Sequence, residues 1–65
     1  MVADYGQQVR RKLREAGCFY KRQAKGDHEL WYSPISKRAF PVDGKIKSRH
    51  SANEILKQAG LPKAF

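Results

Sequence analysis

The stretch KGDHELW at residues 25–31 separates two strand-forming runs and decides how this sequence folds. Gly26 can adopt the positive φ that a tight turn needs, and Asp27 can hydrogen-bond to the local backbone. The run before this turn is too aromatic and too poor in helical periodicity to be a helix, and an apolar run follows the turn. We therefore predict strands at residues 18–24 and 28–33.

A third strand is predicted at residues 38–42, after a turn that contains Pro34 and Lys37. Pro41 lies inside this run and lacks a backbone N–H, so the strand should lie at an edge of the sheet or end there. A basic loop follows, which Asp43 and Gly44 open.

Helical periodicity precedes and follows the three strands. A first helix is predicted with Asp4 as its N-cap and Gly17 as its stop. Its core-facing side chains recur every three or four residues, at Tyr5, Val9, Leu13 and Ala16. Its other face carries Arg10, Arg11, Lys12 and Arg14, which form either a solvated face or a track for phosphates.

A second helix is predicted after Ser51, because Ser51 and Glu54 have the spacing of a capping box. Gly60 and Pro62 end it. Its core-facing stripe consists of Ala52, Ile55, Leu56 and Ala59. Short connections favour antiparallel neighbours, so the order predicts an α+β fold, α-β-β-β-α, with a three-stranded antiparallel sheet and both helices packed on one face. The 65 residues form a single domain, residues 1–65, too small to enclose a deep active site.

The composition identifies polyanions as partners. Lys and Arg number 14 against 6 Asp and Glu, which gives a net charge of +8. Such a charge attracts nucleic acid first, and an acidic membrane surface or protein second. No apolar run approaches the roughly 18 residues that span a bilayer, and no signal peptide is visible, so we expect no membrane association and a cytoplasmic location. Cys18 is the one cysteine, which excludes an internal disulfide.

His28 is the candidate for chemistry. An imidazole can accept a proton from an RNA 2′-hydroxyl or donate one to the leaving 5′-oxygen, and surrounding cations would favour its neutral form. A surface histidine without a role is the alternative. A metal site is not expected, because the consecutive residues Asp27, His28 and Glu29 cannot converge on one ion. His50 lies in the basic loop, where we expect a solvated side chain.

Strand alternation separates two sets of side chains without choosing between them. His28, Leu30 and Tyr32 share one face, and Glu29, Trp31 and Ser33 share the other. Burying Trp31 would contribute on the order of 3 kcal/mol, but Leu30 and Tyr32 together compete for the same core. Alternation alone therefore leaves the exposure of His28 open.

Several motifs together resemble the HicA toxins of bacterial type II toxin–antitoxin systems. They are the GDH step at residues 26–28 between two strands, Trp31, Pro34 and the closing run ILKQAGL at residues 55–61. The resemblance covers nearly the whole chain, and its closing motif is the more specific part. Asp27 stands where many relatives carry Ser or Thr, and Glu29 stands where a second histidine can follow the first.

The resemblance implies a metal-independent mRNA interferase with a double-stranded-RNA-binding-like fold and no cofactor. The family's catalytic histidine maps onto His28, and its apolar position three residues later maps onto Trp31. Trp31 is then expected to face the helices and His28 the open face. A HicB-like antitoxin protein would cover that face and set the assembly. Asp27 would pair with Lys25, bond the backbone of the turn or orient the imidazole.

The leading hypothesis is a small endoribonuclease toxin that cleaves mRNA with His28 as general acid or base. The candidate phosphate contacts are Lys25, Lys45, Lys47 and Arg49. A non-catalytic RNA-binding module is the first alternative, because double-stranded RNA is read largely by shape and by phosphate contacts. A protein whose basic face docks an acidic partner is the second alternative.

Overall fold

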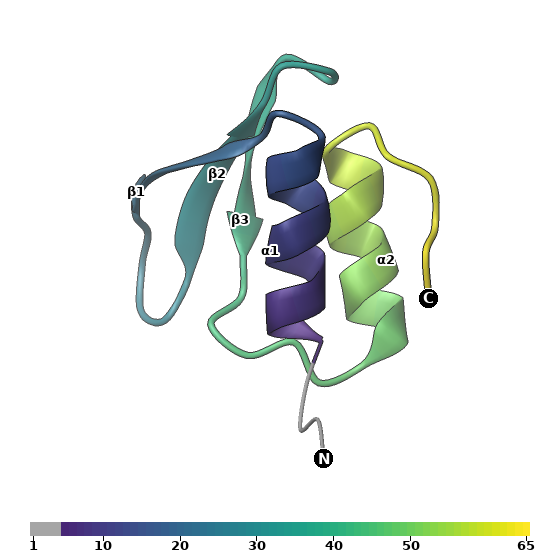
Figure 1. Cartoon of the computed structure of the whole chain (residues 1–65). Helices are drawn as coiled ribbons and strands as arrows, with labels where there is room; N and C mark the ends of the chain where they lie inside the picture. The colour runs from purple at the N-terminus through teal and green to yellow at the C-terminus, as the bar shows by residue number, and fades with distance from the viewer. Residues whose placement is uncertain (1–4) are drawn as a thin grey trace.

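The computed structural model describes residues 5–65, and it confirms the α+β fold. The elements follow in the order α1 (Gly6–Glu15), β1 (Phe19–Gln23), β2 (Glu29–Ser33), β3 (Arg38–Val42) and α2 (Arg49–Gln58). The strands form one antiparallel sheet in the order β1-β2-β3. Figure 1 shows the two helices side by side against this sheet, with α2 preceding the C-terminal segment.

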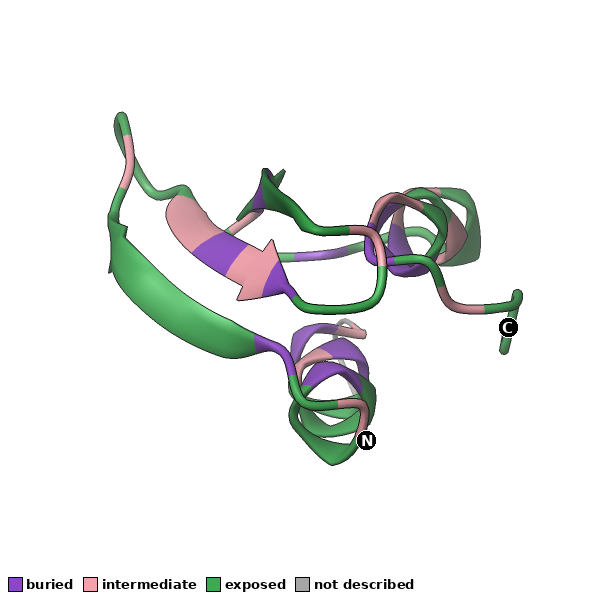
Figure 2. Ribbon diagram, turned by 90° about the horizontal axis from the view of Figure 1, so that it is seen from above, coloured by how far each residue is buried: buried purple, intermediate pink, exposed green. Residues whose placement is uncertain are grey.

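One core lies between the helices and one face of the sheet. Trp31 is its largest side chain and is 2% exposed, so the prediction that Trp31 faces the helices is confirmed. Its partners come from both helices, β3 and the loop after β3, and include Val9, Leu13, Phe40, Val42, Ile46, Ala52, Ile55 and Leu56. By contrast, β1 is exposed along its whole length, as the uniformly green strand in Figure 2 shows.

The strand predictions are correct to within two residues at each end. β3 has the predicted bounds, and Pro41 lies on this edge strand opposite Leu30. β2 begins at Glu29, so His28 lies just before the strand. A β-bulge interrupts the pairing of β1 with β2 between Tyr20 and Arg22.

α1 begins without a side-chain cap. Tyr5 is the N-cap residue, and its backbone N–H donates to the carbonyl of Ile46 at 2.6 Å. The predicted cap, Asp4, lies outside the described residues. The helix ends at Glu15 with Ala16 as its C-cap residue, and the predicted stop, Gly17, follows with a φ of 93°, a conformation that glycine adopts without strain.

The predicted cap of α2 is wrong by one turn. Ser48, in an extended conformation, is the N-cap residue, and its hydroxyl accepts from the backbone N–H of Ser51 at 3.1 Å. Ser48 and Ser51 lie three residues apart in the sequence, and either could serve as the N-cap of α2. The structure uses the earlier one, which puts Arg49 and His50 into the first turn of α2 instead of the loop. No helix among residues 5–65 is long and apolar enough to cross a membrane.

Replacing Ser48 by alanine tests the observed cap. Ser48→Ala should lower the free energy of unfolding by about 1 kcal/mol, because an N–H of the first turn loses its acceptor. Ser51→Ala is the matched control; it removes only a hydroxyl contact with Ser48 and should cost less. Urea unfolding of both variants measures the difference, and a larger loss for Ser51→Ala would contradict the assignment.

Candidate functional site

His28 lies at the end of the turn between β1 and β2, at an exposed end of the sheet. Its backbone carbonyl accepts from the N–H of Ala24 at 2.8 Å, so the pairing of the two strands continues one residue beyond β2. The side-chain amide of Gln23 also donates to the carbonyls of Gly26 and His28, at 2.9 and 3.2 Å. These bonds hold the turn, while the His28 side chain stays 49% exposed.

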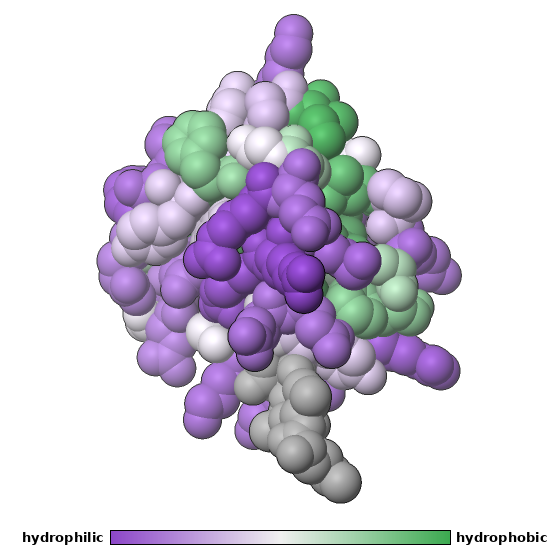
Figure 3. All heavy atoms as spheres, in the orientation of Figure 1, coloured by the Kyte–Doolittle hydropathy of each residue, from purple (hydrophilic) through white to green (hydrophobic). Residues whose placement is uncertain are grey.

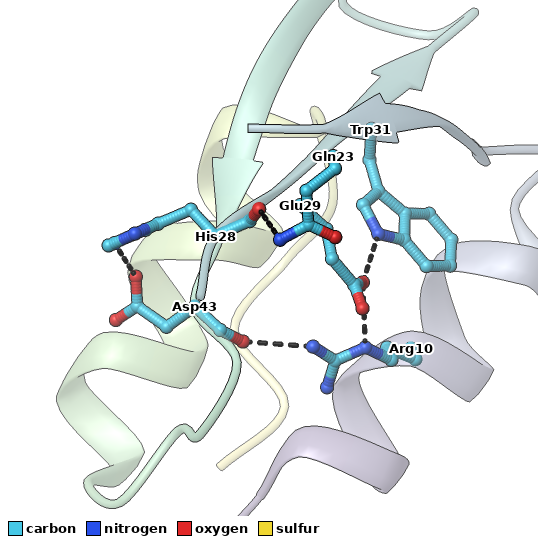
Figure 4. A network of polar contacts seen from close by, with 6 residues as sticks. All are labelled: Arg10, Gln23, His28, Glu29, Trp31 and Asp43. Carbon is cyan, nitrogen blue, oxygen red and sulfur yellow. Dashed lines mark hydrogen bonds and ion pairs between the residues drawn. The ribbon is translucent and has the colours of Figure 1, made fainter. Parts of the chain in front are cut away.

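Both ring nitrogens of His28 face acceptors. Nε2 lies 2.9 Å from Oδ1 of Asp43 (Figure 4). Nδ1 lies 3.1 Å from the carbonyl oxygen of Lys25. A neutral imidazole has one N–H and can donate to only one of them, whereas the imidazolium donates to both. The charged group in contact with the ring is thus a carboxylate and not one of the expected cations. Since Asp43 is also half exposed, a ligand can reach this pair.

The antiparallel register explains why Asp43 meets His28. Val42 pairs with Glu29 and both face the helices, so the next residues along, Asp43 and His28, lie opposite each other on the other face. Gly44 permits the close approach of the two segments. A Cβ at this position would lie 2.9 Å from the carbonyl oxygen of Asp27.

A second polar cluster lies on the helix-facing side of the same strands (Figure 4). Oε1 of Glu29 accepts from Nε of Arg10 at 3.1 Å and from the indole N–H of Trp31 at 2.8 Å. Arg10 also donates from Nη2 to the backbone carbonyl of Asp43 at 2.9 Å. The guanidinium of Arg10 therefore connects α1 to the backbone of Asp43, whose side chain contacts His28.

The electrostatics of Glu29 follow from these contacts. Burial by itself raises the pKa of Glu29, but the hydrogen bonds from Trp31 and Arg10 and the charges of Arg10 and Arg14 outweigh it and lower the pKa below its ordinary value. The contacts of Glu29 therefore stabilise the fold more strongly when its carboxyl group is ionised than when it is protonated.

The four predicted phosphate contacts are exposed but do not form one cluster. Lys25 belongs to the turn that holds His28, and Lys45 follows Asp43 by two residues, so both lie on the segments that meet at the His28–Asp43 pair. Lys47 lies beyond the buried Ile46. Arg49 opens α2 and lines a separate hollow with His50, Lys57, Lys63 and other residues of α2 and the C-terminal segment.

Two residues of the site escaped the sequence reasoning. Asp43 was assigned only to the start of a loop, although strand alternation continued past residue 42 would have placed it opposite His28. Arg10 was grouped with a charged run, yet its side chain is only 17% exposed. The other residues of that run, Arg11, Lys12 and Arg14, are exposed. Figure 3 shows a hydrophilic surface over the front of α1. The carboxylate that contacts the imidazole is that of Asp43, not that of Asp27.

The part of the chain that the structure describes contains no cluster of potential metal ligands. Among residues 5–65, no three His, Cys, Asp or Glu side chains gather closely enough to hold an ion.

The fold and the site define a class: a small basic α-β-β-β-α domain with a half-exposed histidine–aspartate pair at the end of an open sheet. A family model described as "HicA toxin of bacterial toxin-antitoxin" matches residues 6–61 of the 65-residue chain. The chain therefore belongs to the HicA toxin family, and membership implies an antitoxin partner. No match to a curated protein or to a solved structure was found.

Acid should destabilise the fold through Glu29. A carboxyl with a lowered pKa in the folded chain stabilises the fold above its ordinary value of 4.5, and this stabilisation is lost as the pH falls through the folded-state pKa. Glu29→Gln should lower the free energy of unfolding at neutral pH by on the order of 1–3 kcal/mol and flatten its fall below about pH 4.5.

Glu15→Gln is the matched control for this measurement. Glu15 pairs with Arg11 at 3.6 Å on an exposed surface, where an ion pair contributes little. Urea unfolding of both variants at several pH values separates them, and equal acid sensitivity of Glu29→Gln and the unchanged chain would refute the assignment to Glu29.

Proposed function

We propose that this toxin is an endoribonuclease that cleaves mRNA with His28 as its acid–base group. The observation that carries the proposal is the exposed imidazole of His28, held by two acceptors at the end of a sheet in a chain of net charge +8. A basic surface concentrates RNA near the site, and an imidazole is the side chain best suited to move protons near neutral pH.

The contacts of His28 favour the role of general acid. In this step the 2′-hydroxyl of the RNA attacks the phosphorus and loses its proton to solvent water, the bond from phosphorus to the 5′-oxygen breaks, and the imidazolium gives its proton to that oxygen, which leaves a 2′,3′-cyclic phosphate. An imidazolium can donate to both Asp43 and the Lys25 carbonyl, whereas a neutral ring can donate to only one of them. Asp43 would act as a positioning residue that orients the ring. Because its carboxylate is half exposed, the hydrogen bond between Nε2 and Asp43 can be replaced by one between Nε2 and the leaving oxygen.

Lys25 and Lys45 are the proposed contacts for the scissile phosphate, because their segments meet at His28. Lys47 and Arg49 are proposed to hold phosphates farther along the RNA, since they continue the exposed basic segment into the first turn of α2. Each such contact releases counterions, so RNA affinity should fall steeply with salt.

The proposed antitoxin is a HicB-like protein with an acidic surface that covers the His28 face. Its charge would complement the basic toxin, and covering His28 would block access of RNA to the imidazole. An mRNA-cleaving toxin of this kind would act in the cytoplasm.

Replacing His28 tests the proposed catalysis. His28→Ala should lower the rate of mRNA cleavage about 10²- to 10⁴-fold, the usual contribution of a general acid or base, and should abolish growth arrest on expression. His50→Ala is the matched control, because His50 is also exposed but lies on α2. A folded His28→Ala protein as active as His50→Ala refutes the proposal. RNA binding without cleavage by the unaltered, antitoxin-free chain would indicate a binding module instead.

Asp43→Asn tests the positioning role by separating kcat from affinity. Without the carboxylate, the imidazole is less well oriented, so kcat should fall about 10- to 100-fold. RNA affinity should stay equal or rise, because a negative charge leaves a site that binds phosphates. Steady-state cleavage and anisotropy titrations measure the two effects, and an increase in kcat would show that Asp43 blocks His28 instead of orienting it.

A further inference from the structure

The sheet face opposite the helices carries an exposed aromatic and apolar surface, here called the open-face patch. It is identified by the register: residues paired across strands share a face, and Trp31 fixes the other face as the buried one. Phe19 pairs with Tyr32, and their ring centroids lie 5.6 Å apart at an interplanar angle of 44°. The patch consists of Phe19, Leu30, Tyr32, Ala39 and Pro41.

Phe19 is the most accessible part of this patch. Its side chain is 52% exposed, although it is large and apolar. Neither helix covers it, because Phe19 faces away from the helices and β1 is an edge strand that is exposed along its length (Figure 2). The Phe19 side chain at the start of β1 is thus accessible to a ligand.

Cations accompany the rings. The amine of Lys21, at the β-bulge, lies 6.0 Å from the ring centroid of Tyr32, and Arg22 pairs with Leu30 on the same face. Aromatic rings next to amines and guanidinium groups are the combination that binds single-stranded nucleic acid, because the base stacks while the cation meets its phosphate.

His28 lies on this same face. It shares strand parity with Leu30 and Tyr32, and the pairing that continues to Ala24 keeps it in the sheet geometry. Four residues of a strand separate His28 from Tyr32, about 13 Å, a span that a few nucleotides of an extended strand can cover.

We propose that the open-face patch is a base-stacking subsite that holds single-stranded RNA with its phosphate backbone leading to His28. The inference rests on the proposed function for the identity of the ligand. It adds that the substrate is single-stranded, because a duplex hides the faces of its bases and cannot stack on Phe19.

Binding of a short RNA to a cleavage-deficient chain tests the subsite. The probe is a fluorescein-labelled oligoribonucleotide of about eight nucleotides without self-complementarity, titrated into the full chain carrying His28→Ala. Adding Phe19→Leu should weaken binding about 5- to 100-fold, the loss expected for one stacked base. Adding Tyr20→Leu should leave the affinity nearly unchanged. Tyr20 is a matched control, since it is 48% exposed on the same strand but lies on the face of Trp31.

Three further measurements isolate stacking from charge and folding. An oligonucleotide of the same length with abasic positions should bind the Phe19→Leu and Phe19 chains equally, because both keep the same phosphate contacts. Phe19→Tyr keeps a flat ring and should retain the affinity. A duplex of the same sequence should bind more weakly than the single strand and should be insensitive to Phe19→Leu.

The outcomes separate this inference from the nuclease proposal. Equal RNA affinity of Phe19→Leu and Tyr20→Leu overturns the subsite. A Phe19-dependent affinity for single strands supports the subsite even if the unaltered chain cleaves nothing, in which case only the nuclease proposal fails.

Discussion

The burial of Trp31 is the constraint on which the rest of this structure depends. Its side chain fills the space between the sheet and both helices, and because side chains alternate along β2, its orientation determines that of every neighbour. Glu29 must face α1, where Arg10 meets it. His28 and Tyr32 must then face away from the helices. A single large side chain thereby divides one strand into a structural face and an exposed face.

Arg10 connects these two faces. Its guanidinium binds the Glu29 carboxylate and the backbone carbonyl of Asp43, while the side chain of Asp43 reaches the imidazole of His28 on the other face. The position of the partner of His28 is thus coupled to the packing of α1. The part-buried ion pair of Arg10 and Glu29 thus supports the exposed site. It holds the geometry of the site better than two solvated side chains would.

Most of the fold was predictable because its signals are local. Periodicity, turns and Pro41 located the strands and the faces of the helices, while the orientation of Trp31 needed the family resemblance. The features that the sequence did not predict depend on long-range contacts or on two residues that fit the same role equally well. The contact of His28 with Asp43 joins the residue before β2 to the residue after β3 and depends on the register, which no single stretch encodes. The cap of α2 was misassigned because Ser48 and Ser51 offer the same chemistry three residues apart.

The open sheet also bears on how such a toxin can be controlled. With two helices on one face, a chain of 65 residues has one sheet face left for function. If RNA occupies the open-face patch and reaches His28, then an antitoxin that covers His28 occupies the same surface, and the two ligands compete. Acidic side chains on such a partner would oppose the same lysines that we propose as phosphate contacts. Inhibition would then require no conformational change in the toxin, because exclusion of RNA from its one open face is sufficient.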